Sequence, residues 1–174
     1  MAIYALGDLE PTIAVSAYVH PQATVIGDVT LGDGTTVWPQ AVLRGDYGRI
    51  VVGARTSIQD GAVIHCTERH HTVIGDDCVI GHLAHLEGCT VEDGALVGTG
   101  AVVLHRVVVR SGALVGAAAL VPNGTEIPAG AIAVGVPAKV REGAADRDDI
   151  LRNAAGYVLN GERYVKELRR LDDR

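Results

Sequence analysis

Seven histidines in this 174-residue chain could bind a metal ion or transfer protons. Imidazole is the commonest metal ligand in proteins and titrates near neutral pH. His65 directly follows the aliphatic Ile64, and His82 lies seventeen positions later. The polar stretch Cys66–Thr72 lies between them, and inserted loops on rigid scaffolds often carry function. We therefore expect a site near these residues. The histidines are His20, His65, His70, His71, His82, His85 and His105.

An aliphatic residue recurs every six positions through most of the chain, as in Val52, Ile58 and Ile64. Three such units would form one coil of about eighteen residues whose short strands stack on those of the next coil. The narrow core of such a solenoid has no room for large rings, and the chain has no Phe and only 3% aromatic residues. The sequence therefore predicts an all-β solenoid of hexapeptide repeats over residues 1–140. With this spacing, His82 would lie about one coil away from His65, at nearly the same lateral position.

The composition changes after Pro137, and residues 141–174 alternate in charge. Leu151, Ala154 and Val158 follow a helical spacing, which predicts one or two amphipathic helices with a break near Asn160–Gly161. Their apolar stripe is too small to fold alone. We expect this helical tail to form a second unit that packs on the solenoid.

The overall charge argues against several classes of partner. Lys and Arg number 15 and Asp and Glu number 21, so the net charge of −6 disfavours binding to nucleic acid or to anionic membranes. Apolar runs are far shorter than the roughly 20 residues of a membrane-spanning helix. The three cysteines form no CxxC pair and are expected to be buried free thiols. A cytoplasmic protein without nucleic-acid or membrane partners is the simplest expectation.

Several segments, in this order, resemble the signature of the gamma-class carbonic anhydrases: Val42–Asp46, Ile58–His65, Ile80–His82 and Gly88–Thr90. The ending Gly135–Lys139 is similar to the close of the repeat domain in that family, and the resemblance covers nearly the whole chain. It implies a left-handed parallel β-helix with a C-terminal α-helical tail, assembled as a homotrimer. It also implies a Zn²⁺ ion, or another divalent metal such as Fe²⁺ or Co²⁺, between subunits. The implied activity is reversible hydration of CO2 to bicarbonate by a metal-bound hydroxide.

The resemblance also assigns site residues. His65 and His82 match two of the family's three zinc-binding histidines, which would come from neighbouring subunits. Gln59 matches the side chain that orients the metal-bound water, and Tyr164 resembles a tail tyrosine that approaches the site in some members.

Three charged residues match the family's subunit contacts. Arg44 and Asp46 match a buried ion pair at the interface, where a guanidinium can form a bidentate pair with a carboxylate. Asp60 matches an interface residue beside Gln59. These three residues could equally serve only to hold a trimer together.

The sequence departs from the family at the third ligand, a His five positions after the second, because Glu87 stands there. Zinc accepts carboxylate oxygen, and two histidines with one glutamate form a known catalytic site. An anionic ligand makes the metal's water less acidic, which predicts weak CO2 hydration. His85 is a rival third ligand, but at three residues from His82 it would need a local bulge to reach the same ion. The site could also be empty.

Two further functions compete with this one. A hexapeptide-repeat acyltransferase would use an acyl-thioester donor, with His105 or His71 as general base. A non-catalytic trimeric scaffold would keep the fold and have lost the third histidine. In the loop, Glu68, His70 and His71 could relay protons, although a solvated polar loop is the simpler interpretation.

Overall fold

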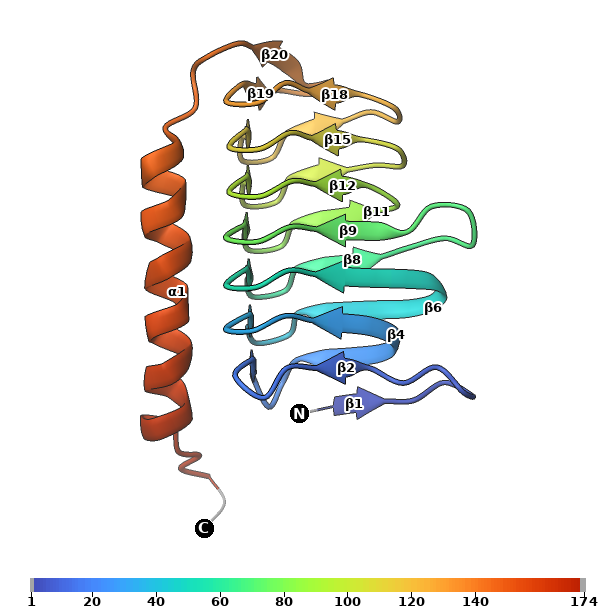
Figure 1. Cartoon of the computed structure of the whole chain (residues 1–174), viewed down its shortest axis with the longest axis vertical. Helices are drawn as coiled ribbons and strands as arrows, with labels where there is room; N and C mark the ends of the chain where they lie inside the picture. The colour runs from blue at the N-terminus through green and yellow to red at the C-terminus, as the bar shows by residue number, and fades with distance from the viewer. Residues whose placement is uncertain (1, 173–174) are drawn as a thin grey trace.

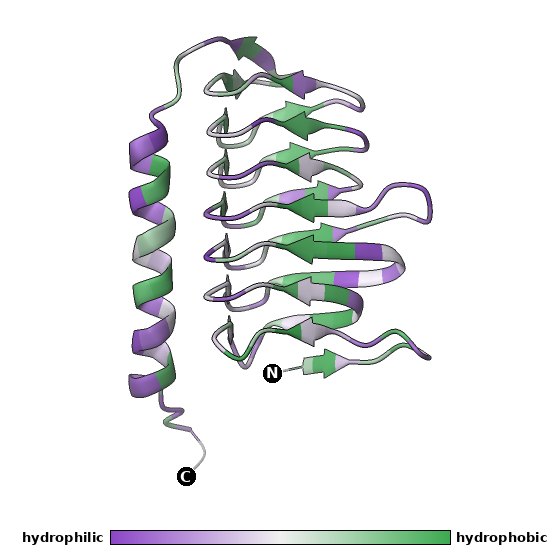
Figure 2. Cartoon of the chain, in the orientation of Figure 1, coloured by the Kyte–Doolittle hydropathy of each residue, from purple (hydrophilic) through white to green (hydrophobic). Residues whose placement is uncertain are grey.

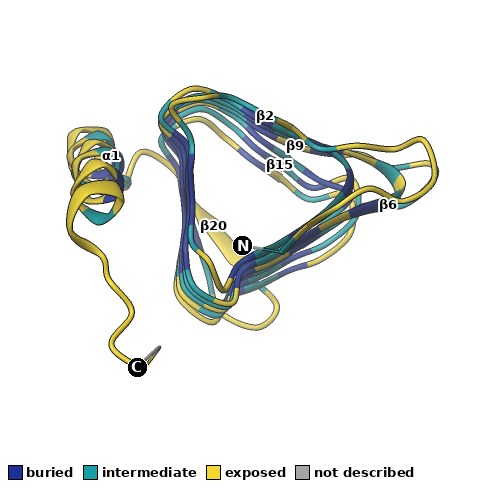
Figure 3. Cartoon of the chain, turned by 90° about the horizontal axis from the view of Figure 1, so that it is seen from below, coloured by how far each residue is buried: buried dark blue, intermediate teal, exposed yellow. Residues whose placement is uncertain are grey.

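Short parallel strands wind into a solenoid with three faces, and one helix lies alongside it (Figures 1 and 3). A computed structural model describes residues 2–172. Seen along its axis, the solenoid is triangular (Figure 3). The predicted all-β solenoid with a helical tail is confirmed.

The strands of each face stack in parallel register along the solenoid axis, except that β20 pairs antiparallel with β19. The first face comprises β1 (Ala2–Tyr4), β4 (Thr24–Leu31), β6 (Val42–Val52), β8 (Val63–His65), β11 (His85–Glu87), β14 (Val102–Val103) and β17 (Leu120–Val121). The second face comprises β2 (Thr12–Ile13), the ends of β4 and β6, β9 (Thr72–Ile74), β12 (Thr90–Val91), β15 (Val108–Val109) and β18 (Glu126–Ile127). The third face comprises β3 (Tyr18–Val19), β5 (Thr36–Val37), β7 (Ser57–Ile58), β10 (Val79–Ile80), β13 (Leu96–Val97), β16 (Leu114–Val115), β19 (Ile132–Val134) and β20 (Lys139–Arg141).

The aliphatic residues of the six-residue repeat fill the prism. Leu43, Ile64 and Leu86 pair in register on consecutive coils of the first face, and all three side chains are fully buried. Parallel strands lie about 4.8 Å apart, so equivalent side chains of successive coils are in contact. This stack fixes the register of β6, β8 and β11, and with it the positions of their outward-facing side chains.

The three cysteines belong to this core. Cys66, Cys78 and Cys89 are buried free thiols, as the sequence predicted. Burial raises the pKa of Cys78 and of Cys89 to about 12, so both remain protonated at neutral pH.

The tail forms one continuous helix, α1 (Arg147–Glu167), packed along the third face (Figure 3). Asp146 caps its start by accepting a hydrogen bond from the Asp149 backbone N–H at 3.0 Å. The expected break near Asn160–Gly161 is wrong. Gly161 is buried within the helix, and a Cβ there would lie 2.7 Å from the methyl group of Thr36. The glycine therefore lets the helix approach the sheet and does not end it.

Polar and apolar segments alternate along α1 (Figure 2). Among residues 2–172, no helix is long and apolar enough to cross a membrane.

The two glycines of α1 give a matched test of this packing. We expect Gly161→Ala to lower the free energy of unfolding by about 1–3 kcal/mol, because the added methyl collides with the third face. Gly156→Ala should raise it by about 0.5–1 kcal/mol, because a Cβ there meets open space and alanine favours the helix. Urea unfolding of both variants measures the difference, and equal effects would contradict the close approach.

Candidate functional site

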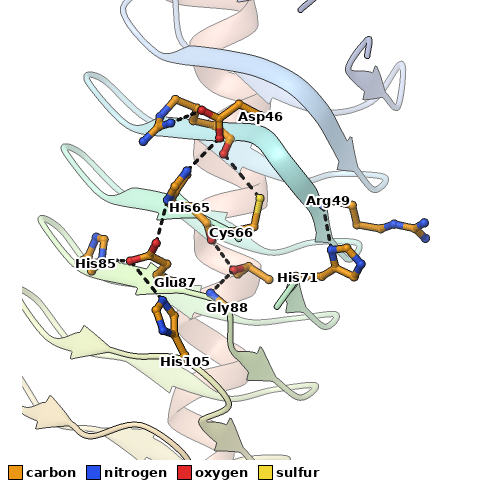
Figure 4. A network of polar contacts seen from close by, with 11 residues as sticks. Asp46, Arg49, His65, Cys66, His71, His85, Glu87, Gly88 and His105 are labelled. Carbon is orange, nitrogen blue, oxygen red and sulfur yellow. Dashed lines mark hydrogen bonds and ion pairs between the residues drawn. The ribbon is translucent and has the colours of Figure 1, made fainter. Parts of the chain in front are cut away.

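A column of charged side chains runs parallel to the solenoid axis where the first face turns into the second (Figure 4). This histidine–carboxylate column consists of Arg44, Asp46, His65 and Glu87. Arg44 pairs with Asp46, whose Oδ1 lies 2.9 Å from His65 Nε2. On the other side, His65 Nδ1 lies 3.0 Å from Glu87 Oε1. The strand register explains the stacking, because Arg44, His65 and Glu87 are direct partners on β6, β8 and β11.

The column keeps both carboxylates ionised. Burial opposes the charge on Asp46, but hydrogen bonds from His65 and Arg44 outweigh this effect and lower the pKa of Asp46. Glu87 behaves in the same way, since contacts with His65 and then His105 overcome its burial and lower its pKa. The two carboxylates therefore flank the His65 ring, and the Arg44 guanidinium lies beside Asp46.

Two further histidines approach the second oxygen of Glu87. His85 Nε2 and His105 Nε2 each lie 3.6 Å from Glu87 Oε2 (Figure 4). From the sequence, His85 was a rival third ligand and His105 a candidate general base, and their grouping around Glu87 was not predicted. The repeat contained the signal for one of them, because His105 stands eighteen positions after Glu87, which is one coil.

His82 does not join the column. The expectation that it lies one coil from His65 at the same lateral position is wrong, because Glu87 is the register partner of His65. The loop after β8 adds residues to this coil, so that 22 positions separate the partners. His82 precedes β11 and Glu87 ends it, which places the two side chains at opposite edges of the first face.

A second cluster, here called the helix-side cluster, contains Gln59, Asp60, His82 and Tyr164. His82 Nδ1 lies 2.9 Å from Asp60 Oδ2, and Gln59 Oε1 accepts a hydrogen bond from the His82 backbone N–H at 3.2 Å. Tyr164 comes from α1 and packs edge-on against Trp38, with ring centroids 5.0 Å apart.

The helix-side cluster borders a cleft of about 250 Å³ between the solenoid and α1. Asp60, His82 and Tyr164 line this cleft together with Tyr157, whose pKa is raised by burial. Tyr157 was not predicted from the sequence, because its place in the cleft depends on how α1 packs.

The site residues predicted from the sequence thus fall into two sets. Arg44, Asp46, His65 and Glu87 form one set, and Gln59, Asp60, His82 and Tyr164 form the other. Within the described chain, no hydrogen bond or ion pair joins the two sets. A site that needs both sets would have to combine two subunits.

The inserted loop after β8 projects from the corner beside the column (Figure 1). His71 Nδ1 accepts a hydrogen bond from the Arg49 backbone N–H at 3.1 Å, which ties the loop to the bend of β6. The ring of His70 lies beside that of His105, with centroids 5.9 Å apart. Of the two loop histidines, His70 is therefore the one beside His105, which faces Glu87.

The column provides two side chains of the kind that zinc prefers. Two ligand atoms on a tetrahedral zinc ion with bonds of 2.0–2.1 Å are roughly 3.3 Å apart, close to the 3.0 Å between His65 Nδ1 and Glu87 Oε1. Among residues 2–172 of one chain, no group of three or more His, Cys, Asp or Glu side chains could hold a metal ion. His65 and Glu87 thus fit as a pair of ligands that needs a third from elsewhere.

Comparison with known proteins places the chain in a family. It is 44% identical to a Methanocaldococcus jannaschii protein named "Probable carbonic anhydrase", over 86% of this chain and 96% of that protein. It is also 40% identical to the mitochondrial gamma carbonic anhydrase 2 of Arabidopsis thaliana, over 92% of this chain. The chain belongs to the gamma carbonic anhydrase family. The chain spans about 60% of the length of that plant relative.

The fold and the repeat agree with this membership. Residues 71–105 match the model of the bacterial transferase hexapeptide (six repeats). A crystal structure from Bacillus cereus, of a protein described as a candidate acetyltransferase, superposes with a TM-score of 0.91. Its sequence is 34% identical, and the match covers 94% of this chain and 96% of that one. A gamma carbonic anhydrase-like chain therefore shares its scaffold with proteins described as transferases.

Gly88 provides a test of how the column is built. Its φ is +61°, and a Cβ there would lie 2.7 Å from the Cβ of His70 and 3.1 Å from His105 Cδ2. Gly100 has φ +66° but open space around it. We expect Gly100→Ala to cost about 1–2 kcal/mol of unfolding free energy from backbone strain, and Gly88→Ala about 1–3 kcal/mol more. Urea denaturation measures both, and equal losses would show that His70 and His105 are not packed against Gly88.

Proposed function

We propose that this chain is the subunit of a homotrimeric metalloenzyme of the gamma carbonic anhydrase type, which hydrates CO2 reversibly to bicarbonate. Its metal site would lie between subunits. His65 and Glu87 of one subunit and His82 of a neighbouring subunit would hold the ion. The observation that carries the proposal is the 3.0 Å contact between His65 Nδ1 and Glu87 Oε1, a ligand pair that has no third member among residues 2–172 of its own chain.

The position of His82 supports a shared site. His82 precedes β11 and Glu87 ends it, and among the described residues no ion pair joins them. When identical subunits form a closed ring, one edge of each subunit meets the other edge of the next. A ring that packs through the first face would bring the helix-side cluster of one subunit to the column of its neighbour.

The residues present suit a divalent ion with mixed nitrogen and oxygen ligands, such as Zn²⁺, Fe²⁺ or Co²⁺. Such an ion supplies Lewis acidity, which makes water nucleophilic at neutral pH. Gln59, held beside His82 by its backbone contact, would orient the reacting water. Tyr164 lines the same cleft as His82 and would border the space for the small substrate.

Arg44, Asp46 and Asp60 would have structural roles at the interface. Asp46 holds His65 on the side away from Glu87, and Arg44 pairs with Asp46. Asp60 holds the His82 ring. Each of these carboxylates therefore contacts a proposed metal ligand and would fix its orientation.

Mixed trimers test the shared site directly. We expect the wild-type protein, purified without chelators, to hold about one divalent metal per chain. His65→Ala and His82→Ala homotrimers should each hold almost none. Trimers reassembled from an equal mixture of the two variants should hold about a quarter of the wild-type metal, because one interface in four then pairs an intact His65 with an intact His82.

Elemental analysis and stopped-flow CO2 hydration on the same samples give the result. A mixture that holds no more metal than the single variants would contradict a site shared between subunits. Wild-type protein without stoichiometric metal would contradict the metalloenzyme itself.

A ligand replacement tests the effect of the carboxylate. We expect Glu87→His to keep the metal and to raise the rate of CO2 hydration. A neutral ligand leaves more charge on the metal, so the rate should rise by about tenfold for each unit by which the pKa of the metal-bound water falls. An unchanged rate at equal metal content would show that Glu87 does not limit the natural protein.

The alternative function is that of an acyltransferase, which the description of the Bacillus cereus structure favours. It would use His105 or His71 as general base, but His105 faces Glu87 and His71 accepts a bond from the Arg49 backbone. Saturable release of CoA from acetyl-CoA with amine or hydroxyl acceptors would support it. A trimer with neither metal nor CoA release would point to the non-catalytic scaffold.

The absence of nucleic-acid and membrane partners and a cytoplasmic location remain predictions from the sequence. The Arabidopsis thaliana relative is named as mitochondrial. Fractionation of cells that express the full chain would locate it.

A further inference from the structure

The two oxygens of the Glu87 carboxylate have different surroundings. Oε1 lies 3.0 Å from His65 Nδ1, whereas Oε2 lies 3.6 Å from both His85 Nε2 and His105 Nε2 (Figure 4). The two histidines come from different coils, His85 from β11 itself and His105 from the turn after β14. They therefore converge on one oxygen from two directions.

His105 is held in this position by its neighbours. Its Nε2 is buried and has no hydrogen-bond partner in the described part of the chain, and the Glu87 carboxylate lies 3.6 Å away. The ring of His70 lies 5.9 Å away on one side, and Gly88 leaves room for both rings. A buried imidazole nitrogen without a partner is costly unless a nearby group compensates it.

We infer that His85 and His105 are positioning residues that hold Glu87 Oε2 and thereby present Oε1 alone beside His65. The inference rests on the proposed function, because it concerns how Glu87 would serve as a metal ligand. A carboxylate can bind a metal through one oxygen or two, and its side chain has more rotatable bonds than that of histidine. In this chain the two extra imidazoles restrict the carboxylate that stands where the family has a histidine.

The structure also indicates why both histidines would be needed. Each contact to Oε2 is 3.6 Å long, beyond a strong hydrogen bond, so neither alone fixes the group. Approach from β11 on one side and from the next coil on the other restricts rotation of the carboxylate in both directions. Groups that orient a metal ligand typically change metal affinity by about 10–100-fold when they are removed.

The test compares His85→Ala, His105→Ala and the double variant with the wild type in the full-length protein. His105→Gln serves as a rescue, because its amide can donate to Oε2. His20→Ala is the matched control, since that imidazole accepts a bond from the Gln22 backbone and lies outside the column. Zn²⁺ affinity is measured by competition with a chelator, and the visible spectrum of the Co²⁺-loaded protein reports the coordination number.

We expect each alanine variant to weaken Zn²⁺ binding by about tenfold, and the double variant by more. The Co²⁺ band should lose intensity in the double variant, because a released Oε2 adds a second oxygen ligand. His105→Gln should recover part of the affinity, and His20→Ala should match the wild type. A loss of affinity without the spectral change would indicate a merely structural role and overturn the inference.

Two other results would also overturn it. Unchanged Zn²⁺ affinity in the double variant, with metal bound to the wild type, would refute the positioning role and leave the proposed function intact. A wild type that binds no Zn²⁺ would refute both. Thermal unfolding of each variant identifies any that fail to fold, and His85→Ala, on the partly exposed strand surface, then decides the outcome.

Discussion

The parallel register between β8 and β11 places His65 directly opposite Glu87, and the candidate site depends on it. That register is set inside the prism, where Ile64 packs between Leu43 and Leu86. Because side chains alternate in direction along a strand, a slip of one residue would turn His65 into the core. The aliphatic stack inside the prism therefore controls the position of the polar groups on its outer surface.

The column places polar partners beside two partly buried carboxylates, Asp46 and Glu87. The two carboxylates lie on either side of one imidazole, and each needs a polar partner. In the isolated chain His65 contacts both carboxylates, and Arg44 pairs with Asp46. A divalent ion between His65 and Glu87 would provide the same compensation, since metal and proton are alternative partners for these atoms. The groups that stabilise the chain are thus those suited to bind an ion.

The six-residue spacing predicted the solenoid, because an aliphatic residue at every sixth position can be buried in few other ways. The same spacing misplaced His82, since the loop after β8 lengthens one coil and shifts the partner of His65 to Glu87. The continuity of α1 was also missed. A glycine in a helical pattern indicates a break, and only the structure shows that Gly161 lets the helix pack closely against Thr36. The grouping of His85 and His105 around Glu87 required the register of three coils together, and no single motif contains it.

Anomalous X-ray diffraction from crystals of the zinc-loaded protein, recorded at the zinc absorption edge, tests the central claim most directly. The account predicts one zinc peak at each subunit interface, beside His65 and Glu87 of one chain and His82 of its neighbour. A peak coordinated within a single chain, or an interface that keeps His82 away from Glu87, would contradict it.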